Sequence, residues 1–150
     1  MALDTAAITL AVSSLSVSGV DIRDIDRIPD EVTVRQCPIM FPAPGEIAAG
    51  YEDAPATFGG ATGAYWSVMR TIGFLYLHAP VGEGRGAFSH YAGLAEKADA
   101  MIEKFMELDI DDVDIMSVKI DGFSKPIEGP SGNQFFGFMV NMTVREKVNA

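Results

Sequence analysis

The sequence has few of the residues that carry covalent, metal or phosphate chemistry. Its 150 residues include one cysteine, two histidines and 11 basic side chains against 21 acidic ones, for a formal net charge of −10. Cys37 alone excludes an intramolecular disulfide, and a cysteine-based zinc site would need ligands from elsewhere. The acidic balance argues against tight wrapping of nucleic acid, because phosphate backbones are repelled. A channel through which DNA slides is compatible with this acidic net charge.

Long apolar runs are also lacking. The N-terminal stretch ALDTAAITLAVSSLSVSGV has no positively charged start, carries Asp4 early and is too short and serine-rich to span a bilayer. No later segment reaches transmembrane length. We therefore expect a protein that is made without a signal peptide and does not enter a membrane. Its length and a hydrophobic content of 48% favour one domain over residues 1–150.

Hydrophobic spacing predicts two helices. Over residues 5–18, apolar side chains recur at helical spacing, and Gly19 follows as an end signal. Residues 87–108 give the strongest pattern, with a charged face opposite a continuous apolar stripe made of Tyr91, Leu94, Ala95, Ala98, Met101, Ile102, Phe105 and Leu108. Both segments are therefore expected to pack an apolar face on a core.

Strand patterns occur at residues 31–41, 65–79, 113–120 and 134–146. Residues 65–79 are apolar on both sides, which predicts a central strand covered on both faces. Residues 134–146 alternate between apolar and polar side chains, which predicts one buried face. Long loops are expected at residues 42–64, 81–86 and 121–133. The sequence thus predicts an α/β (α+β) fold, in which two main helices pack on a mixed, mostly antiparallel sheet.

The stretch LHAPVGEGRGAF places a glycine-rich connection between a strand and a helix, which is the order found in phosphate-binding loops. Gly82, Gly84 and Gly86 have the spacing G-x-G-x-G, which matches neither the dinucleotide motif nor the P-loop. Glu83 adds negative charge, and Ala87 begins the helix where a P-loop has lysine. We favour a strand-to-helix connection from which Arg85 projects.

Other candidate sites are weak. The aspartates of residues 109–114 lack the glycine and the final glutamate of a calcium loop and are better explained as a solvated turn. His78 and His90 have no cysteine partner beside them, and such histidines are more often surface residues than ligands. Cys37 lies between apolar neighbours, where cysteine usually behaves as a small buried hydrophobe rather than a nucleophile. Asn141 heads a glycosylation sequon inside a predicted strand, and we dismiss it.

The loops at residues 42–64, 81–86 and 122–133 are left unexplained by core packing. A chain with a good core and long connections rich in glycine and proline is typical of proteins that make protein–protein contacts. We therefore expect neither catalysis nor a cofactor or metal.

Several segments, taken together and in order, resemble the tail terminator (tail completion) proteins of long-tailed phages. They are a short N-terminal helix, RQCPIMFPAPGE, a long loop with TFGG, GFLYLHAP closing on VGEGRG, AFSHYAGLAEKADAMIEKF and QFFGFMVNMTVRE. The resemblance covers nearly the whole chain and lies in layout more than in any fixed signature.

The resemblance implies a virion subunit at the junction of tail and neck. It implies a six-membered ring of this chain that caps the tail tube, stops tube growth and offers a surface to the neck or head-completion proteins, with DNA passing through the lumen. It implies no enzyme activity and no cofactor. Aromatic and arginine side chains often anchor interfaces, so the expected contact residues are Phe41, Tyr51, Phe58, Arg85 and Phe123.

Two alternatives stay open at this stage. The chain could be another phage part, such as the tail tube protein or a neck or head-completion protein. It could also be a small nucleotide-binding domain that uses residues 82–86. Stacking of rings would indicate the first alternative, and a nucleotide-dependent rise in melting temperature would indicate the second.

Overall fold

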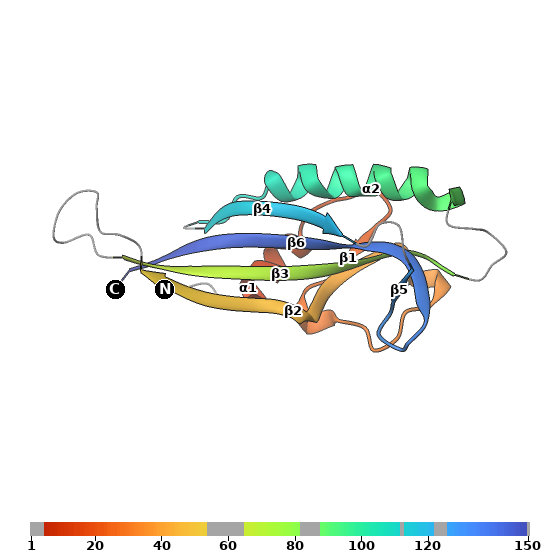
Figure 1. Ribbon diagram of the computed structural model, residues 1–150, viewed down its shortest axis with the longest axis horizontal. Coiled ribbons are helices and arrows are strands. Elements are labelled where there is room, and N and C mark those ends of the chain that lie inside the picture. Colours follow the sequence, from red (N-terminus) through yellow and green to blue (C-terminus); the bar gives the residue numbers. More distant parts are fainter. Residues whose placement is uncertain (1–4, 54–64, 82–87, 112, 122–125, 150) are drawn as a thin grey trace.

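The computed structural model describes residues 5–53, 65–81, 88–111, 113–121 and 126–149, which form one mixed sheet with two α-helices (Figure 1). The sheet has the strand order β1-β2-β3-β6-β4, and β5 pairs with β6. Only the β1–β2 pair is parallel. The predicted α+β fold is therefore confirmed.

The elements, in chain order, are α1 (Thr5–Ser13), β1 (Asp21–Ile22), the 3-10 helices η1 (Ile25–Arg27) and η2 (Val34–Gln36), β2 (Ile39–Asp53), β3 (Tyr65–Pro80), α2 (Phe88–Met106), β4 (Val113–Asp121), β5 (Ile127–Glu128) and β6 (Gln134–Asn149).

Both helices pack on the same face of the sheet and enclose the main core. Phe105 of α2 meets Phe74 of β3 edge to face, with ring centroids 5.5 Å apart. Such an arrangement adds about 1 kcal/mol beyond the burial of the two rings. The core consists of Ile8, Val12, Val17, Ile22, Met40, Ile72, Phe74, Tyr76, Leu94, Ala98, Met101, Phe105, Phe136, Phe138, Val140, Met142 and Val144. The apolar stripe predicted for residues 87–108 accordingly covers the sheet, except at Ala95 and Ile102, which are exposed.

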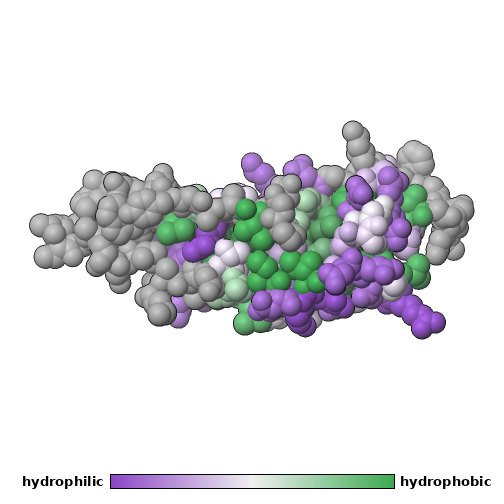
Figure 2. Space-filling view, turned by 90° about the horizontal axis from the view of Figure 1, so that it is seen from below, coloured by the Kyte–Doolittle hydropathy of each residue, from purple (hydrophilic) through white to green (hydrophobic). Residues whose placement is uncertain are grey.

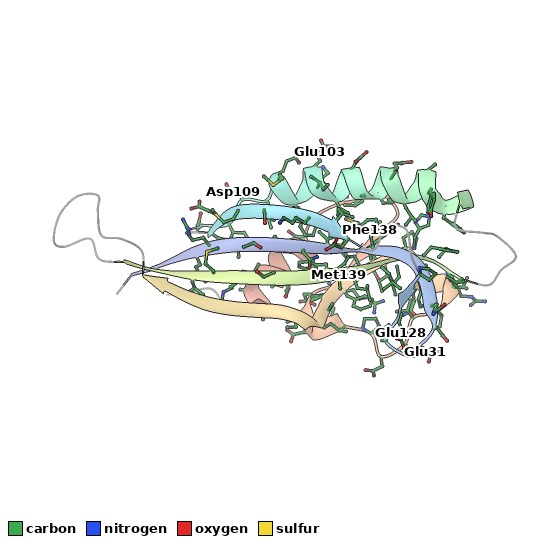
Figure 3. All side chains as sticks on the ribbon, in the orientation of Figure 1. Glu31, Glu103, Asp109, Glu128, Phe138 and Met139 are labelled. Atoms are coloured by element: carbon green, nitrogen blue, oxygen red, sulfur yellow. The ribbon has the colours of Figure 1, made fainter. Side chains whose placement is uncertain are left out.

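A smaller core lies on the opposite face, at one end of the sheet. It contains Val32, Ile39, Phe41, Leu75, Leu77 and Phe135. Leu75 and Leu77 thus face this core while Phe74 and Tyr76 face the helices. The prediction that this strand is covered on both faces is confirmed for this part. On β6, Phe138 faces the main core and its neighbour Met139 packs against the smaller one (Figure 3).

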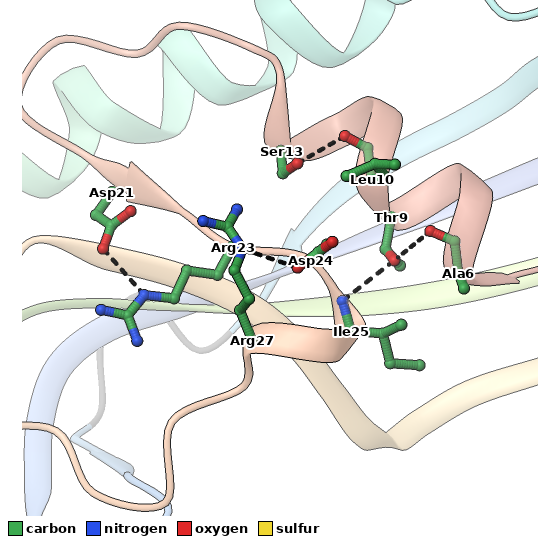
Figure 4. A network of polar contacts seen from close by, with 9 residues as sticks. All are labelled: Ala6, Thr9, Leu10, Ser13, Asp21, Arg23, Asp24, Ile25 and Arg27. Carbon is green, nitrogen blue, oxygen red and sulfur yellow. Dashed lines mark hydrogen bonds and ion pairs between the residues drawn. The ribbon is translucent and has the colours of Figure 1, made fainter.

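Helix α1 ends at Ser13, five residues before the predicted end. The Ser13 hydroxyl donates to the Leu10 carbonyl and the Ser14 hydroxyl to that of Ala11, at 2.6 and 2.5 Å. Such side-chain bonds compete with the helical backbone ladder and end the helix. Thr9, which is fully buried, donates from Oγ1 to the Ala6 carbonyl and accepts from the Ile25 amide, which joins η1 to α1 (Figure 4).

The predicted strand at residues 31–41 is wrong in its first part. Residues Val34–Gln36 form η2, because the Gln36 side chain accepts from the Thr33 amide at 2.7 Å and completes a capping box. The strand begins only at Ile39. Cys37 therefore precedes β2 and does not lie inside a strand.

The predicted loop at residues 42–64 is also wrong in its first part. β2 continues to Asp53 and pairs with β3 from Ile47↔Ile72 to Asp53↔Trp66. The register shifts between Pro42 and Ile47, where the proline residues provide no amide donor. Residues 54–64 lie outside the described part.

The predicted strands at 65–79, 113–120 and 134–146 are confirmed, and the last of them, β6, extends to Asn149. The segment 121–133, for which the sequence predicts a loop, contains the short strand β5.

Candidate interaction surfaces

Two of the five expected contact residues, Phe41 and Tyr51, lie in the described part of the chain, both on β2. Phe41 is 2% exposed and packs in the smaller core, so in this conformation its ring offers no surface to a partner. Tyr51 pairs with Val68 through the backbone near the end of β2. Phe58, Arg85 and Phe123 lie outside the described residues. Phe41 is therefore buried in this conformation, and the other four residues stay predictions.

The half-buried Cys37 has the character of a packed thiol. It contacts the smaller core, and burial raises the pKa of its thiol above the ordinary value. A raised pKa leaves less thiolate at neutral pH, which is the opposite of what a nucleophilic cysteine needs. The Nδ1 atom of His78 lies 2.7 Å from the Tyr76 hydroxyl, which is the hydrogen-bond partner that the structure describes for this histidine.

No group of three or more potential metal-ligating residues occurs among the residues that the structure describes. In the predicted acidic turn, Asp109, Asp111 and Asp114 are exposed, and an isolated bridge between Ile110 and Val113 closes the turn. The glycines of the predicted phosphate loop fall in residues 82–87, outside the described part.

A pocket of about 300 Å³ opens at the end of the sheet that carries the smaller core. Phe135 contributes a buried ring to its lining, whereas Val34 from η2 and Val81 after β3 are exposed at it. Glu31, Asn133 and Gln134 add polar groups. Glu31 and Glu128 both lie at this end of the molecule (Figure 3). We call this feature, with the exposed Val34 and Val81, the pocket end.

A second exposed apolar group lies on α2 and β4. Met106 and Ile102 are one helical turn apart on α2, and Met116 is the residue of β4 at which its register with β6 shifts. Their side chains are 55%, 38% and 47% exposed. We use the name α2–β4 patch for these three exposed residues, which are carried by two neighbouring elements. Leu10 on α1 and Val34 at the pocket end are also more than half exposed.

The side of the molecule below β2 is mixed in character. Figure 2 shows hydrophobic residues gathered near the middle of the long axis, next to a band of hydrophilic residues. Two strand edges are also open among the described residues, because β4 pairs only with β6, and β1 covers only Ile39 and Met40 of β2. Open strand edges are sites at which another chain can add a strand.

The exposed apolar residues were not predicted from the sequence. The sequence pattern predicts Ile102 on the buried stripe of the second helix and Val34 in a strand. A helical pattern gives the direction of a stripe but not its width, so a residue at its border is not distinguished from a core residue. The proximity of the Tyr76 and His78 side chains could be predicted from the sequence, because residues two apart in a strand lie on the same face of the sheet.

No α-helix in the described ranges is long and apolar enough to cross a membrane. No protein-family model matches this chain, and a comparison with curated proteins finds no match either.

Proposed function

We propose that this chain is a structural subunit of a phage tail, of the tail terminator type. It forms a six-membered ring that caps the tail tube, ends tube polymerisation and provides the surface to which the neck or head-completion proteins attach. It is assembled into the virion at the junction of tail and neck. The order of its segments, which resembles that of tail terminators, supports this proposal together with the surfaces described above.

The observation that carries the proposal is the presence of two different exposed apolar groups on separate elements. The α2–β4 patch lies toward the C-terminal end of α2, whereas the pocket end lies where β3 finishes and β6 begins. A closed ring of identical subunits uses two different surfaces that complement each other, whereas a twofold dimer uses one surface twice. Apolar side chains that are more than half exposed at both places fit the first arrangement.

The two ends of the long axis also differ. At one end β2, β3 and β6 continue past both helices, and at the other end lie the pocket and the start of α2 (Figure 1). A terminator ring has two different partners, the tube protein on one side and the connector on the other. Chemically distinct ends suit this role.

The charge of the chain is compatible with DNA passing through a ring lumen. The formal net charge of −10 for each subunit repels a phosphate backbone, so DNA moves through without adhering.

Negative-stain electron microscopy of the purified protein tests the proposal. Closed, single-layered rings with sixfold symmetry are the expected result. Rings that stack into tubes at every protein concentration would instead identify a tube protein. Particles no larger than one chain, both alone and with isolated tail tubes, would overturn the proposal.

A further inference from the structure

The side chain of His78 lies between β3 and the N-terminal half of α2, where its ring meets that of His90. Its Nδ1 atom lies 2.7 Å from the hydroxyl of Tyr76, which is fully buried in the main core. On the helix side the ring touches Gly93, where a Cβ atom would lie 3.2 Å from its Nε2 atom. The imidazole is therefore held between a buried hydroxyl and the helix backbone.

The direction of the Tyr76–His78 hydrogen bond follows from the state of the tyrosine. Burial holds the pKa of the Tyr76 hydroxyl far above its ordinary value, so the hydroxyl keeps its proton. Among the described residues, this hydroxyl is hydrogen-bonded to His78 Nδ1. The hydroxyl consequently donates and the Nδ1 atom accepts, which requires a neutral ring with its proton on Nε2.

The groups around His78 disfavour a positive charge on it. Its pKa is lowered by burial first, and then by His90 and Lys97. The His90 ring is 5.7 Å from that of His78 and stacks on Phe136 at 4.8 Å, and Lys97 Nζ donates to the Ser18 carbonyl. The described titratable groups facing His78 are thus Tyr76 from β3 and His90 and Lys97 from α2, while β6 contributes aromatic rings. No carboxylate is ion-paired with His78 in the described part of the chain.

We propose that His78 is an acid-sensitive latch that holds the N-terminal half of α2 on the sheet while neutral and releases it when protonated. Protonation converts Nδ1 into a donor, so it no longer accepts from the Tyr76 hydroxyl, and the proton of this buried hydroxyl loses the acceptor described for it. It also places a half-buried cation between the strand and α2, close to the His90 ring and in the field of Lys97. The C-terminal half of α2 is held separately by Phe105 against Phe74 and stays in place.

The latch lies near the pocket end. β3 continues from His78 to its end at Pro80, and the next residue, Val81, is one of the exposed residues of the pocket. Release of the helix would therefore change the surface at this end while the main sheet persists. This inference concerns a single chain and does not rest on ring formation.

Amide hydrogen exchange and histidine NMR titration between pH 7.5 and pH 5 test the latch. The expected result is that the amides of residues 90–98 lose protection as the His78 ring titrates, below the ordinary histidine value of 6.5, whereas those of residues 101–106 do not. His78→Gln keeps an acceptor for Tyr76 without a titrating ring, and residues 90–98 should stay protected at pH 5. His90→Gln is the matched control, because it keeps the latch and moves its transition to higher pH.

Two results would overturn the proposal. One is an equal loss of protection in wild type and His78→Gln after correction for intrinsic exchange rates. The other is exchange in residues 90–98 that does not follow the His78 titration, a comparison that uses the wild-type protein and so does not depend on the variant folding.

Discussion

The guanidinium group of Arg70 lies 3.4 Å from the carboxylate of Glu146, on the neighbouring strand. Arg70 also donates to the Thr5 hydroxyl at 3.1 Å. Glu146 is 1% exposed. The start of α1 is therefore tied to the sheet through a buried carboxylate and its arginine.

Arg70→Met is expected to lower the free energy of unfolding by about 3 kcal/mol, because the buried carboxylate of Glu146 loses this ion pair. Glu146→Gln removes the charge and keeps the shape, so its cost should be smaller, about 1–2 kcal/mol. Urea unfolding of both variants measures the difference. Equal stabilities for wild type and Arg70→Met would show that the pair does not hold α1.

Gly137 of β6 stands opposite Leu77, and a Cβ atom there would overlap the carbonyl oxygen of Tyr76. Because backbone would have to move, Gly137→Ala should cost about 3 kcal/mol or more. Gly19→Ala is the matched control. Gly19 has a φ of 77° but open space around it, so that change costs only the backbone strain, about 1 kcal/mol. A smaller cost at Gly137 than at Gly19 in thermal unfolding would contradict the close approach of β3 and β6.

Met106→Asp tests the α2–β4 patch as a subunit contact. A charge in place of an exposed apolar side chain should raise the concentration needed for ring assembly by about tenfold or more while the fold persists. Ala95→Asp puts the same charge on an exposed position three turns away on the same helix and should have a smaller effect. Sedimentation velocity measures assembly and circular dichroism measures the fold. Unchanged assembly in Met106→Asp would remove this patch from the ring contact.

The thiol of Cys37 should react slowly. Its folded-state pKa lies above the reference value of 9.0, so alkylation by iodoacetamide at pH 8 should be about tenfold slower in the folded than in the unfolded protein. The raised pKa of this thiol also makes the stability of the folded protein depend on pH. The stability contributed by the neutral thiol is full below pH 9.0 and is lost as the pH rises through the folded pKa. A folded-state rate equal to that of the unfolded chain would contradict this burial.

The segments with strong periodicity could be predicted from the sequence, and the weakly patterned ones could not. The apolar stripe of α2 and the alternation of β6 follow from side chains that contact the core directly. Residues 45–53 have many small side chains and no sustained hydrophobic period. They become part of a strand because the segment from Ile47 to Asp53 pairs with β3. Tertiary pairing, rather than local preference, decides this segment.

Residues 31–36 show the opposite case. Val32 and Val34 alternate as in a strand, but the Thr33–Gln36 capping box forms a 3-10 turn and leaves Val34 exposed at the pocket. The pocket joins this turn to the ends of β3 and β6, which are far apart in the sequence. Its geometry therefore could not be derived from spacing along the chain.

Light scattering of the purified protein over a concentration series measures both ring formation and its limit. We expect a closed species of about six times the chain mass of 16.1 kDa, with no larger species as concentration rises. Unlimited growth with concentration would contradict a terminator, since such a ring must stop. A mass of one chain at every concentration, together with no binding to tail tubes, would contradict the ring itself.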